Sequence, residues 1–456
     1  MKSFLKLPSD ARFSNKDIIT FMMPIFFEQI LIASLTMANT FMIKKLPDSA
    51  TTLAAIANVG PIDTLFKQVF VAFAAGGGVF ISQFIGAGRP KDAGRAMKMS
   101  IYSMLGISLV ITLVLEIIKA PLLNLLYPSV DAQVMKESLQ YYSITIFAYP
   151  FMALFNCGTA SFRAIGKSRV TFYSSIAMMS VNIGLKYVFL FIFGMGVIGA
   201  GLSLLIAYAV AGITLFVLLC SKKNNVRLEN PFKLEWDWSL VKRIYTVATP
   251  SGIENGMFQL GPLLLQTLVA SLGTAAINAN YLVSTVSPMT HSMASAFQLG
   301  IIPFISQCMG AGKPDEAEFY TKHILKLGKL FSLGAAIVAI SAAPFILTIF
   351  ESDPAARWQS VYAAWIYFAA TPFFYLTSFA LPAALRGTGD TKFPMIAAIC
   401  TMFAFRIGCA YLLVKVFNVG FIAVWIAMVS DWVVRSIIFT IRFRQGKWKK
   451  NVLIGD

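Results

Sequence analysis

The chain has 456 residues, of which 57% are hydrophobic and only 13% are charged. Lys and Arg outnumber Asp and Glu by 38 to 21, which gives a formal net charge of +17. Apolar runs of about 20 residues, long enough to cross roughly 30 Å of hydrocarbon, recur along the chain. This composition excludes a water-soluble globular protein and predicts an all-α membrane protein.

Twelve membrane-spanning helices are predicted, six in each half, because only helices pair all their backbone polar groups within one segment in lipid. In chain order, the predicted spans of the first half are about 18–43, 53–83, 97–118, 137–162, 170–193 and 197–220. Those of the second half are about 241–272, 276–306, 323–350, 360–385, 391–416 and 419–443. The predicted domains are an N-terminal lobe over 1–220, a cytoplasmic connector over 221–240, and a C-terminal lobe with a basic tail over 241–456.

The two halves repeat each other. The segment ISQFIGAGRPKDA near residue 81 returns as ISQCMGAGKPDEA near residue 305. Pro24 and Glu28 have the same spacing as Pro250 and Glu254. A repeat of six spans, an even number, re-enters the membrane from the same side, so the two six-helix lobes should share one orientation. Internal repeats of this kind are typical of secondary transporters, whose substrates bind where the halves face each other.

The basic charge indicates topology. Lys and Arg gather at both termini and in the loops on one side of the twelve predicted spans. By the positive-inside rule, that side is cytoplasmic. The charge therefore indicates contact with a lipid surface and not with nucleic acid. Short loops favour a multi-pass protein of a bacterial inner membrane, which we expect to be a monomer.

The sequence has no motif of an enzyme or an ATPase. It lacks a Gly-x4-Gly-Lys-Ser/Thr loop, so an ion gradient and not ATP is the expected energy source. It also lacks His-Glu-x-x-His, paired catalytic carboxylates and a nucleophile elbow, and its five cysteines form no Cys-x-x-Cys. We therefore expect neither catalysis, nor a bound metal, nor a cofactor other than the coupling ion.

Ionisable residues inside the predicted spans are the candidates for function, because burying a charge in lipid is costly. There are eight of them: Glu28, Asp63, Lys67, Lys186, Glu254, Arg406, Asp431 and Arg435. Asp63 and Lys67 are four residues apart on one helix, as are Asp431 and Arg435. This spacing predicts two structural ion pairs.

The remaining four ionisable residues are predicted to couple transport to an ion. Glu28 and Glu254 are equivalent positions of the repeat. Glu254 and Arg406 lie at similar depths in spans that both start at the cytoplasmic side, so a contact between them is allowed. Glu28 and Lys186 are less well matched in depth. We therefore propose Glu254 as the principal ion- or proton-responsive carboxylate, with a purely structural cross-link as the alternative.

Several motifs together resemble the multidrug and toxic compound extrusion (MATE) family. They are the repeated GAG(R/K)P-x-(D/E)-A loop, RGTGDTKFP from Arg386, the closing DWVVRSIIFTIRFRQGKWK, Gly420 with Trp425, and Asn182-x-x-x-Lys186. The resemblance covers nearly the whole chain. It implies twelve helices in two six-helix lobes related by a pseudo-twofold axis. It also implies export of organic, often cationic or aromatic, compounds in exchange for Na⁺ or H⁺.

Two positions depart from the family pattern. Many members carry an aspartate where this chain has Asn39, and another where it has Lys186. An amide cannot exchange a proton, and an ammonium repels Na⁺ at close range. Either coupling has moved to Glu254, or Lys186 itself changes its charge state.

The substrate cavity is expected to be lined by polar and aromatic side chains. The candidates are Asn39, Asn182, Phe26, Phe27, Tyr281, Phe373, Phe374 and Tyr375. The main alternative function is a flippase for lipid-linked oligosaccharides, or another exporter of a related fold, which would need a large cationic cavity. A channel, a receptor or a membrane-embedded enzyme has less support in the sequence.

Overall fold

The computed structural model describes residues 12–46, 49–233, 235–350, 354–451 and 453–455. These residues form α-helices, joined or interrupted by short π- and 3-10 helices, and no strand is found among them. Eleven helices of this described part are long and apolar enough to cross a membrane. The prediction of an all-α membrane protein is confirmed. Two predicted segments lie partly outside the described residues, namely the N-terminal tail up to residue 11 and position 234 of the connector.

The remaining predicted span, over about 241–272, corresponds to helix α7 (Trp238–Ala270). It is not among the eleven apolar helices. Its sequence carries several polar side chains, among them Glu254 and Asn255. Its apolar side chains Ile253, Leu260 and Leu263 are 42–48% exposed, whereas Glu254 is 3% exposed, so the helix has a buried polar position and an exposed apolar face.

The chain divides into two compact units, which we call unit N (Leu31–Gly256) and unit C (Met1–Ile30 with Met257–Asp456). Helix α1 (Asn15–Lys44) passes from unit C into unit N after Ile30, and α7 passes from unit N into unit C after Gly256. This division differs from the lobe boundaries at about 220 and 241, which stay a prediction.

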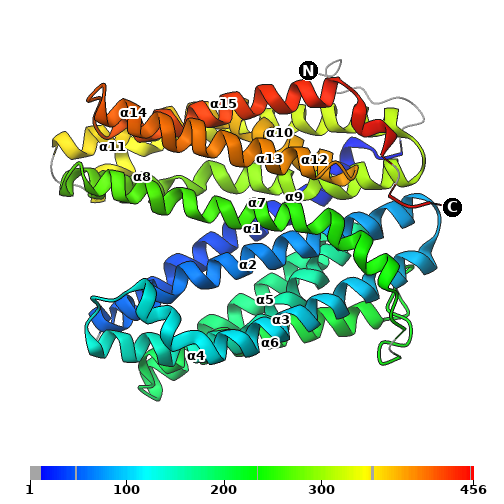
Figure 1. The fold of residues 1–456 in the computed structure, drawn as a ribbon, viewed down its shortest axis with the longest axis horizontal. Coiled ribbons are helices and arrows are strands. Elements are labelled where there is room, and N and C mark those ends of the chain that lie inside the picture. Colours follow the sequence, from blue (N-terminus) through cyan, green and yellow to red (C-terminus); the bar gives the residue numbers. More distant parts are fainter. Residues whose placement is uncertain (1–11, 47–48, 234, 351–353, 452, 456) are drawn as a thin grey trace. The chain divides into compact units, whose positions relative to one another are not determined.

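Unit N is built around helix α4. Its complete helices are α2 (Ser49–Gly86), α3 (Pro90–Leu126), α4 (Ala132–Ala164), α5 (Ser168–Tyr187) and α6 (Gly196–Cys220), and α5 continues into a π-helix, η2 (Val188–Ile192). Helix α4 packs against both α2 and α6, and these helices run alongside one another (Figure 1). Helix α3 turns a row of apolar side chains outward, where lipid solvates them: Leu109, Val110, Leu113, Val114 and Ile117.

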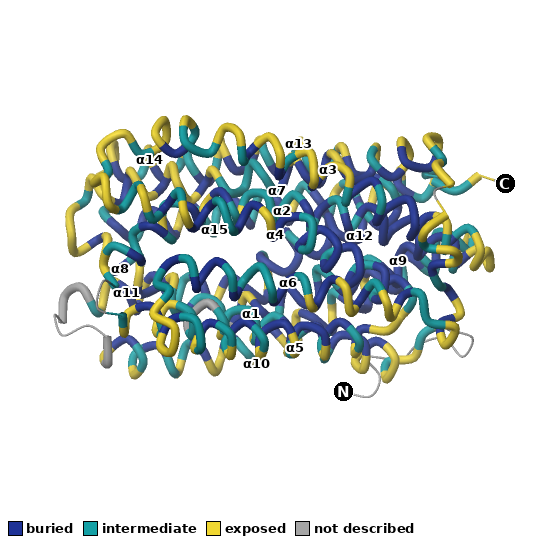
Figure 2. The backbone as a smooth tube through the Cα atoms, turned by 90° about the horizontal axis from the view of Figure 1, so that it is seen from below, coloured by how far each residue is buried: buried dark blue, intermediate teal, exposed yellow. Residues whose placement is uncertain are grey.

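Unit C contains more broken helices. They are α8 (Thr274–Val286), α9 (Pro288–Gly310), α10 (Pro314–Phe350), α11 (Pro354–Ala370), η3 (Thr371–Tyr375), α12 (Leu376–Gly387), α13 (Lys392–Thr401), η4 (Met402–Gly408), α14 (Cys409–Lys415), α15 (Ile422–Arg444) and η5 (Lys447–Lys450). Helices α9 and α12 pack against each other and are mostly buried (Figure 2).

Three predicted spans of unit C are interrupted, two of them at a proline. The eighth span breaks at Pro288, which separates α8 from α9. The tenth contains the π-helix η3 around Pro372, and the eleventh contains η4, which carries Arg406. Short π-helices often lie at functional sites, because they rotate the side chains that follow them.

Glycine allows two close helix contacts in unit N. A Cβ on Gly76 would lie 2.9 Å from the Cα of Ala248, so α2 and α7 approach closely there. A Cβ on Gly158 would lie 2.8 Å from the Cβ of Leu215, which brings α4 close to α6. Small residues at helix contacts are typical of membrane bundles, where tight packing replaces the hydrophobic effect between helices.

The repeated loops have the same local structure in both halves. Gly88 and Gly312 have φ angles of +71° and +69°, a conformation that glycine adopts without strain. A proline then begins the next helix, Pro90 in α3 and Pro314 in α10. The N–H groups of a first helical turn have no carbonyl partner within the helix. Proline, which lacks an N–H, therefore fits there without loss of a hydrogen bond. The repeat is therefore structural as well as sequential.

Candidate functional site

Unit N holds a buried lysine beside an asparagine of another helix. Lys186 lies near the end of α5 and is 5% exposed. Its Nζ donates a hydrogen bond of 2.8 Å to Oδ1 of Asn39 in α1. The structure therefore brings together the two positions at which the sequence departs from the family pattern. Their contact was not predicted, because they are 147 positions apart in the chain.

A second buried amide lies one helical turn from this lysine. Asn182 is 1% exposed, and neither its Nδ2 nor its Oδ1 has a hydrogen-bond partner among the described residues. Residues four apart on a helix share a face, so Asn182 and Lys186 project to the same side of α5. A buried amide without partners costs free energy, which marks this position as one that a ligand or water can satisfy.

Asp63 is held by hydroxyl groups of α4. Its Oδ1 accepts hydrogen bonds from the Tyr149 hydroxyl at 2.8 Å and from the Thr145 hydroxyl at 3.3 Å. The hydrogen bonds that the structure gives this carboxylate thus come from α4 and not from Lys67, which corrects the predicted ion pair. The physical reason is that a packed neighbouring helix presents short, well-aligned donors, whereas a lysine on the same helix must bend its long chain back.

In unit C, the π-helix η4 directs Arg406 toward α15. Its Nη2 lies 3.1 Å from Oδ2 of Asp431, and the two side chains are 10% and 0% exposed. Asp431 therefore pairs with an arginine of another helix, which corrects the predicted pair with Arg435. The predicted contact of Arg406 with Glu254 would join unit C to unit N and stays a prediction.

Arg435 has aromatic neighbours instead of the predicted aspartate. Its guanidinium carbon lies 4.7 Å from the ring centre of Phe258, 4.5 Å from that of Phe379 and 5.7 Å from that of Phe439. Its Nη2 also donates to the carbonyl of Ser378 at 3.4 Å. A desolvated cation over aromatic faces gains about 2 kcal/mol per contact. Arginine favours this arrangement because its planar group stacks on rings.

These cations border an aromatic cluster inside unit C. Tyr375 stacks on Phe379 with ring centres 4.4 Å apart and meets Trp432 edge-on at 4.8 Å. Tyr367 contacts Trp432 at 5.2 Å. His291 lies 5.3 Å from the Tyr375 ring, and its Nδ1 is 3.1 Å from the Ser295 hydroxyl. The cluster was missed in the sequence, except for Tyr375, because its members come from five different helical segments.

The other aromatic residues predicted to line a cavity differ in exposure. Tyr281, Phe373 and Phe27 are 66%, 54% and 46% exposed, whereas Tyr375 is 4% exposed. Phe26 and Phe374 are partly buried against the core of unit C. Phe26 also lines a small apolar pocket between α1, α9 and α10, together with Met22, Met293, Phe297 and Phe331. The assignment of these residues to a substrate cavity stays a prediction.

The two glutamates of the repeat are buried at equivalent places. Glu28 and Glu254 are 2% and 3% exposed. Each lies two residues before the point at which its helix passes from one compact unit into the other, after Ile30 in α1 and after Gly256 in α7. A proline precedes each glutamate by four residues, Pro24 in α1 and Pro250 in α7. The repeat thus places a buried carboxyl group on each helix that links the units.

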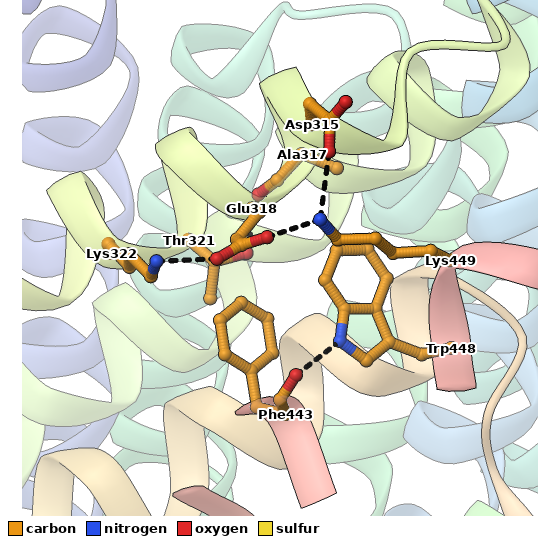
Figure 3. A network of polar contacts seen from close by, with 8 residues as sticks. All are labelled: Asp315, Ala317, Glu318, Thr321, Lys322, Phe443, Trp448 and Lys449. Carbon is orange, nitrogen blue, oxygen red and sulfur yellow. Dashed lines mark hydrogen bonds and ion pairs between the residues drawn. The ribbon is translucent and has the colours of Figure 1, made fainter. Parts of the chain in front are cut away.

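At one end of unit C, the basic C-terminal segment binds the repeated loop. Nζ of Lys449 lies 2.8 Å from Oδ1 of Asp315 and also pairs with Glu318 (Figure 3). The hydrogen bond from Lys449 to Asp315, followed by that to Glu318, raises the pKa of the lysine. Trp448 is fully buried, and its Nε1 donates to the carbonyl of Phe443 at 2.8 Å (Figure 3). These contacts anchor the start of α10.

Unit N has a corresponding contact between its repeated loop and the connector. Arg95 in α3 pairs with Asp237 at 3.3 Å, and Lys98 donates to the carbonyl of Asn230 at 3.0 Å. In both halves, the segment that follows the sixth predicted span therefore folds back onto the helix after the GAG loop. The charges are reversed between the halves, since α3 supplies basic side chains to the connector and α10 supplies acidic ones to the C-terminal segment.

Comparison with known proteins connects this arrangement to a transporter family. A profile of the MatE family matches residues 24–188 and 250–412. The chain is 25% identical over 448 residues to a probable multidrug resistance protein NorM of Thermotoga maritima, covering 96% of this chain and 94% of that protein. It is 23% identical over 346 residues to the multidrug export protein MepA of Staphylococcus haemolyticus, covering 74% of each.

Solved structures share the fold. A MATE protein in the straight conformation matches with a TM-score of 0.85 at 18% identity, over 95% of this chain and 97% of that chain. An outward-facing multidrug resistance MATE family transporter of the MOP superfamily matches with a TM-score of 0.84 at 19% identity, over 95% and 96%. The predicted twelve-helix fold of two lobes agrees with this likeness.

Proposed function

Because the chain belongs to the MatE family of multidrug efflux transporters, we propose that it is a secondary active exporter. It exchanges organic, often cationic or aromatic, compounds for inward-moving Na⁺ or H⁺ by alternating access. Members of this family are transporters and not enzymes, and we expect no cofactor apart from the coupling ion. We place the protein as a monomer in a bacterial inner membrane with both termini in the cytoplasm.

The observation that carries this proposal is the pair of buried glutamates on the linking helices. Glu28 and Glu254 are 2% and 3% exposed. An ionised carboxylate in such a place is costly, and its charge state depends on whether a cation or a proton reaches it. A change of charge on α1 or α7 acts on a helix that belongs to both units. Ion binding can thereby shift the balance between two conformations.

We assign the principal coupling role to Glu254. The position at which many family members carry a second acid is Lys186 here, so the Asn39–Lys186 contact is poorly suited to bind a cation. Asp431 is already neutralised by Arg406. Glu254 lies on a helix that belongs to both units, so it remains our principal candidate, with a change of charge on Lys186 as the alternative.

The flippase alternative needs a large cationic cavity for a phosphorylated, sugar-bearing lipid. The contacts of unit C favour it less. Arg406 pairs with an acidic partner, and the guanidinium of Arg435 lies against three phenyl rings. These two cations are thus engaged within the unit. The aromatic cluster around Tyr375 supports small flat substrates more than a large polar one.

Transport by purified protein in vesicles tests the proposal. The full chain is reconstituted into liposomes, and movement of ethidium, an aromatic cation, is followed under an imposed Na⁺ gradient, an imposed H⁺ gradient, or neither. We expect uphill movement under one of the two gradients and none without a gradient. Dye movement that is equal in all three conditions, or equal to that of protein-free vesicles, would contradict the proposal.

A further inference from the structure

The buried face of α5 in unit N carries polar groups that coupling through Glu254 does not use. Lys186 and Asn182 lie one turn apart on this face and are 5% and 1% exposed. Asn39 of α1 reaches the same place, because its Oδ1 accepts from the lysine. The three side chains come from two helices, and both of these segments are apolar enough to span the membrane.

The charge at this place is positive. The acceptor of the Lys186 hydrogen bond is an amide oxygen, which carries no formal charge. An ammonium has three donors, and the bond to Asn39 uses one of them. A buried ammonium beside a neutral amide is stabilised far less than one beside a carboxylate. The site is therefore suited to an anionic group and unsuited to Na⁺.

Asn182 gives the second, independent observation. Its Nδ2 and Oδ1 both lack a hydrogen-bond partner among the described residues, although the side chain is almost completely buried. A buried amide is rarely left in this state unless something else satisfies it. Its Nδ2 is a donor on the same helix face as the lysine. Together, the amide and the ammonium provide two donors from one side of α5.

We propose that Lys186, Asn182 and Asn39 form a binding site for the carboxylate of an organic compound. The carboxylate accepts from Nζ of Lys186 and from Nδ2 of Asn182, and Asn39 holds the lysine in place through its Oδ1. The Oδ1 of Asn182 then accepts from a hydroxyl or N–H group of the same compound. This inference rests on the proposed export function and adds to its substrates a further class, compounds that carry an acidic group, including zwitterions.

Binding to the purified full-length protein tests this site without any ion gradient. Isothermal titration in detergent compares 1-naphthoate with 1-naphthamide, which has the same ring system and a neutral group. We expect the wild type to bind the carboxylate about ten- to a hundredfold more tightly, the range of a charge-assisted hydrogen bond. Lys186→Gln should remove this preference. Asn39→Asp should also remove it, because an internal carboxylate then occupies the lysine.

Lys67→Gln is the matched control, since it removes another lysine of an apolar helix of unit N and should keep the preference. Thermal unfolding and gel filtration check that each variant is folded. If Lys186→Gln does not fold, the affinities of the wild type and of Asn39→Asp for the two compounds still test the site. Equal affinity of the wild type for both compounds would overturn the site, as would an unchanged preference in Asn39→Asp.

The same experiment separates this inference from the export function. A carboxylate preference that depends on Lys186, found together with no ethidium transport in vesicles, would support the site and contradict the proposed export. Gradient-driven transport with no carboxylate preference would support export and overturn the site.

Discussion

The ion pair between Arg406 and Asp431 predicts a large loss of stability when one partner is removed. Nη2 of the arginine is 3.1 Å from Oδ2 of the aspartate, and the side chains are 10% and 0% exposed. Asp431→Asn keeps the size of the side chain but leaves the guanidinium without its counter-charge. Removing one partner of a buried pair costs about 3–5 kcal/mol. At about 2–4 °C per kcal/mol for a unit of this size, Tm should fall by about 6–20 °C.

Thermal unfolding of the purified protein in detergent, followed by tryptophan fluorescence, measures this loss. Asp92→Asn is the matched control, because its pair with Arg89 has side chains that are 41% and 28% exposed and should contribute less than about 1 kcal/mol. The double variant Arg406→Met with Asp431→Asn should recover much of the lost stability, since no unpaired charge remains. A Tm of Asp431→Asn equal to that of the control would refute the reasoning. The reasoning would also be refuted if the double variant lost as much stability as Arg406→Met and Asp431→Asn lose together.

Three further predictions follow from single contacts. Tyr149→Phe removes a 2.8 Å hydrogen bond to Asp63 and should lower the free energy of unfolding by about 1.5–3 kcal/mol, and an unchanged denaturation midpoint would contradict this. Gly76→Ala should destabilise the protein by about 1–3 kcal/mol through overpacking, whereas Gly106→Ala, with open space around it, should not, as paired melting curves would show. Lys449→Ala should increase hydrogen exchange at the start of α10 at neutral pH. The pKa of this lysine is raised, so its ion pairs stay charged until the pH rises above the ordinary pKa of lysine. Equal hydrogen exchange in Lys449→Ala and the wild type would contradict the prediction.

The positions of the helices could largely be predicted from the sequence. Hydrophobic length and the internal repeat indicate twelve spans, and eleven helices of the described part have the expected length and apolar composition. The repeated loops adopt the same conformation at Gly88 and Gly312 because the same residues recur there. The interruptions of the helices were not predicted. A π-helix such as η4 depends on how the helix packs, and its sequence carries no proline or glycine signal before Arg406.

The partners of the buried charges could be predicted less well. Spacing along one helix predicted ion pairs of Asp63 with Lys67 and of Asp431 with Arg435. In the structure, Asp63 accepts a hydrogen bond from Tyr149 of α4. Asp431 forms an ion pair with Arg406 of η4. Pairing rules for one helix do not include the donors of neighbouring helices. These pairs were therefore beyond sequence reasoning.

The contact of Asn39 with Lys186 had a usable signal. Both positions differ from the family pattern, and two simultaneous losses of an acid suggest that the residues are neighbours. This contact was not predicted, and the structure shows it as a hydrogen bond of 2.8 Å. The proposed binding site also depends on the burial of Asn182 and on its unpartnered amide. These could not be predicted from the sequence, because they depend on how α5 packs in unit N.

The ion dependence of Glu254→Gln tests the central claim most directly. Wild type, Glu254→Gln and the control Glu116→Gln, which changes a carboxylate paired with Lys119 in α3, are reconstituted and compared for ethidium transport under stepped Na⁺ and H⁺ gradients. The account predicts that Glu254→Gln is folded but has lost the dependence of its transport on the driving ion, while the control retains it. Transport by Glu254→Gln with the ion dependence and pH profile of the wild type would contradict the account and make Glu254 a structural residue.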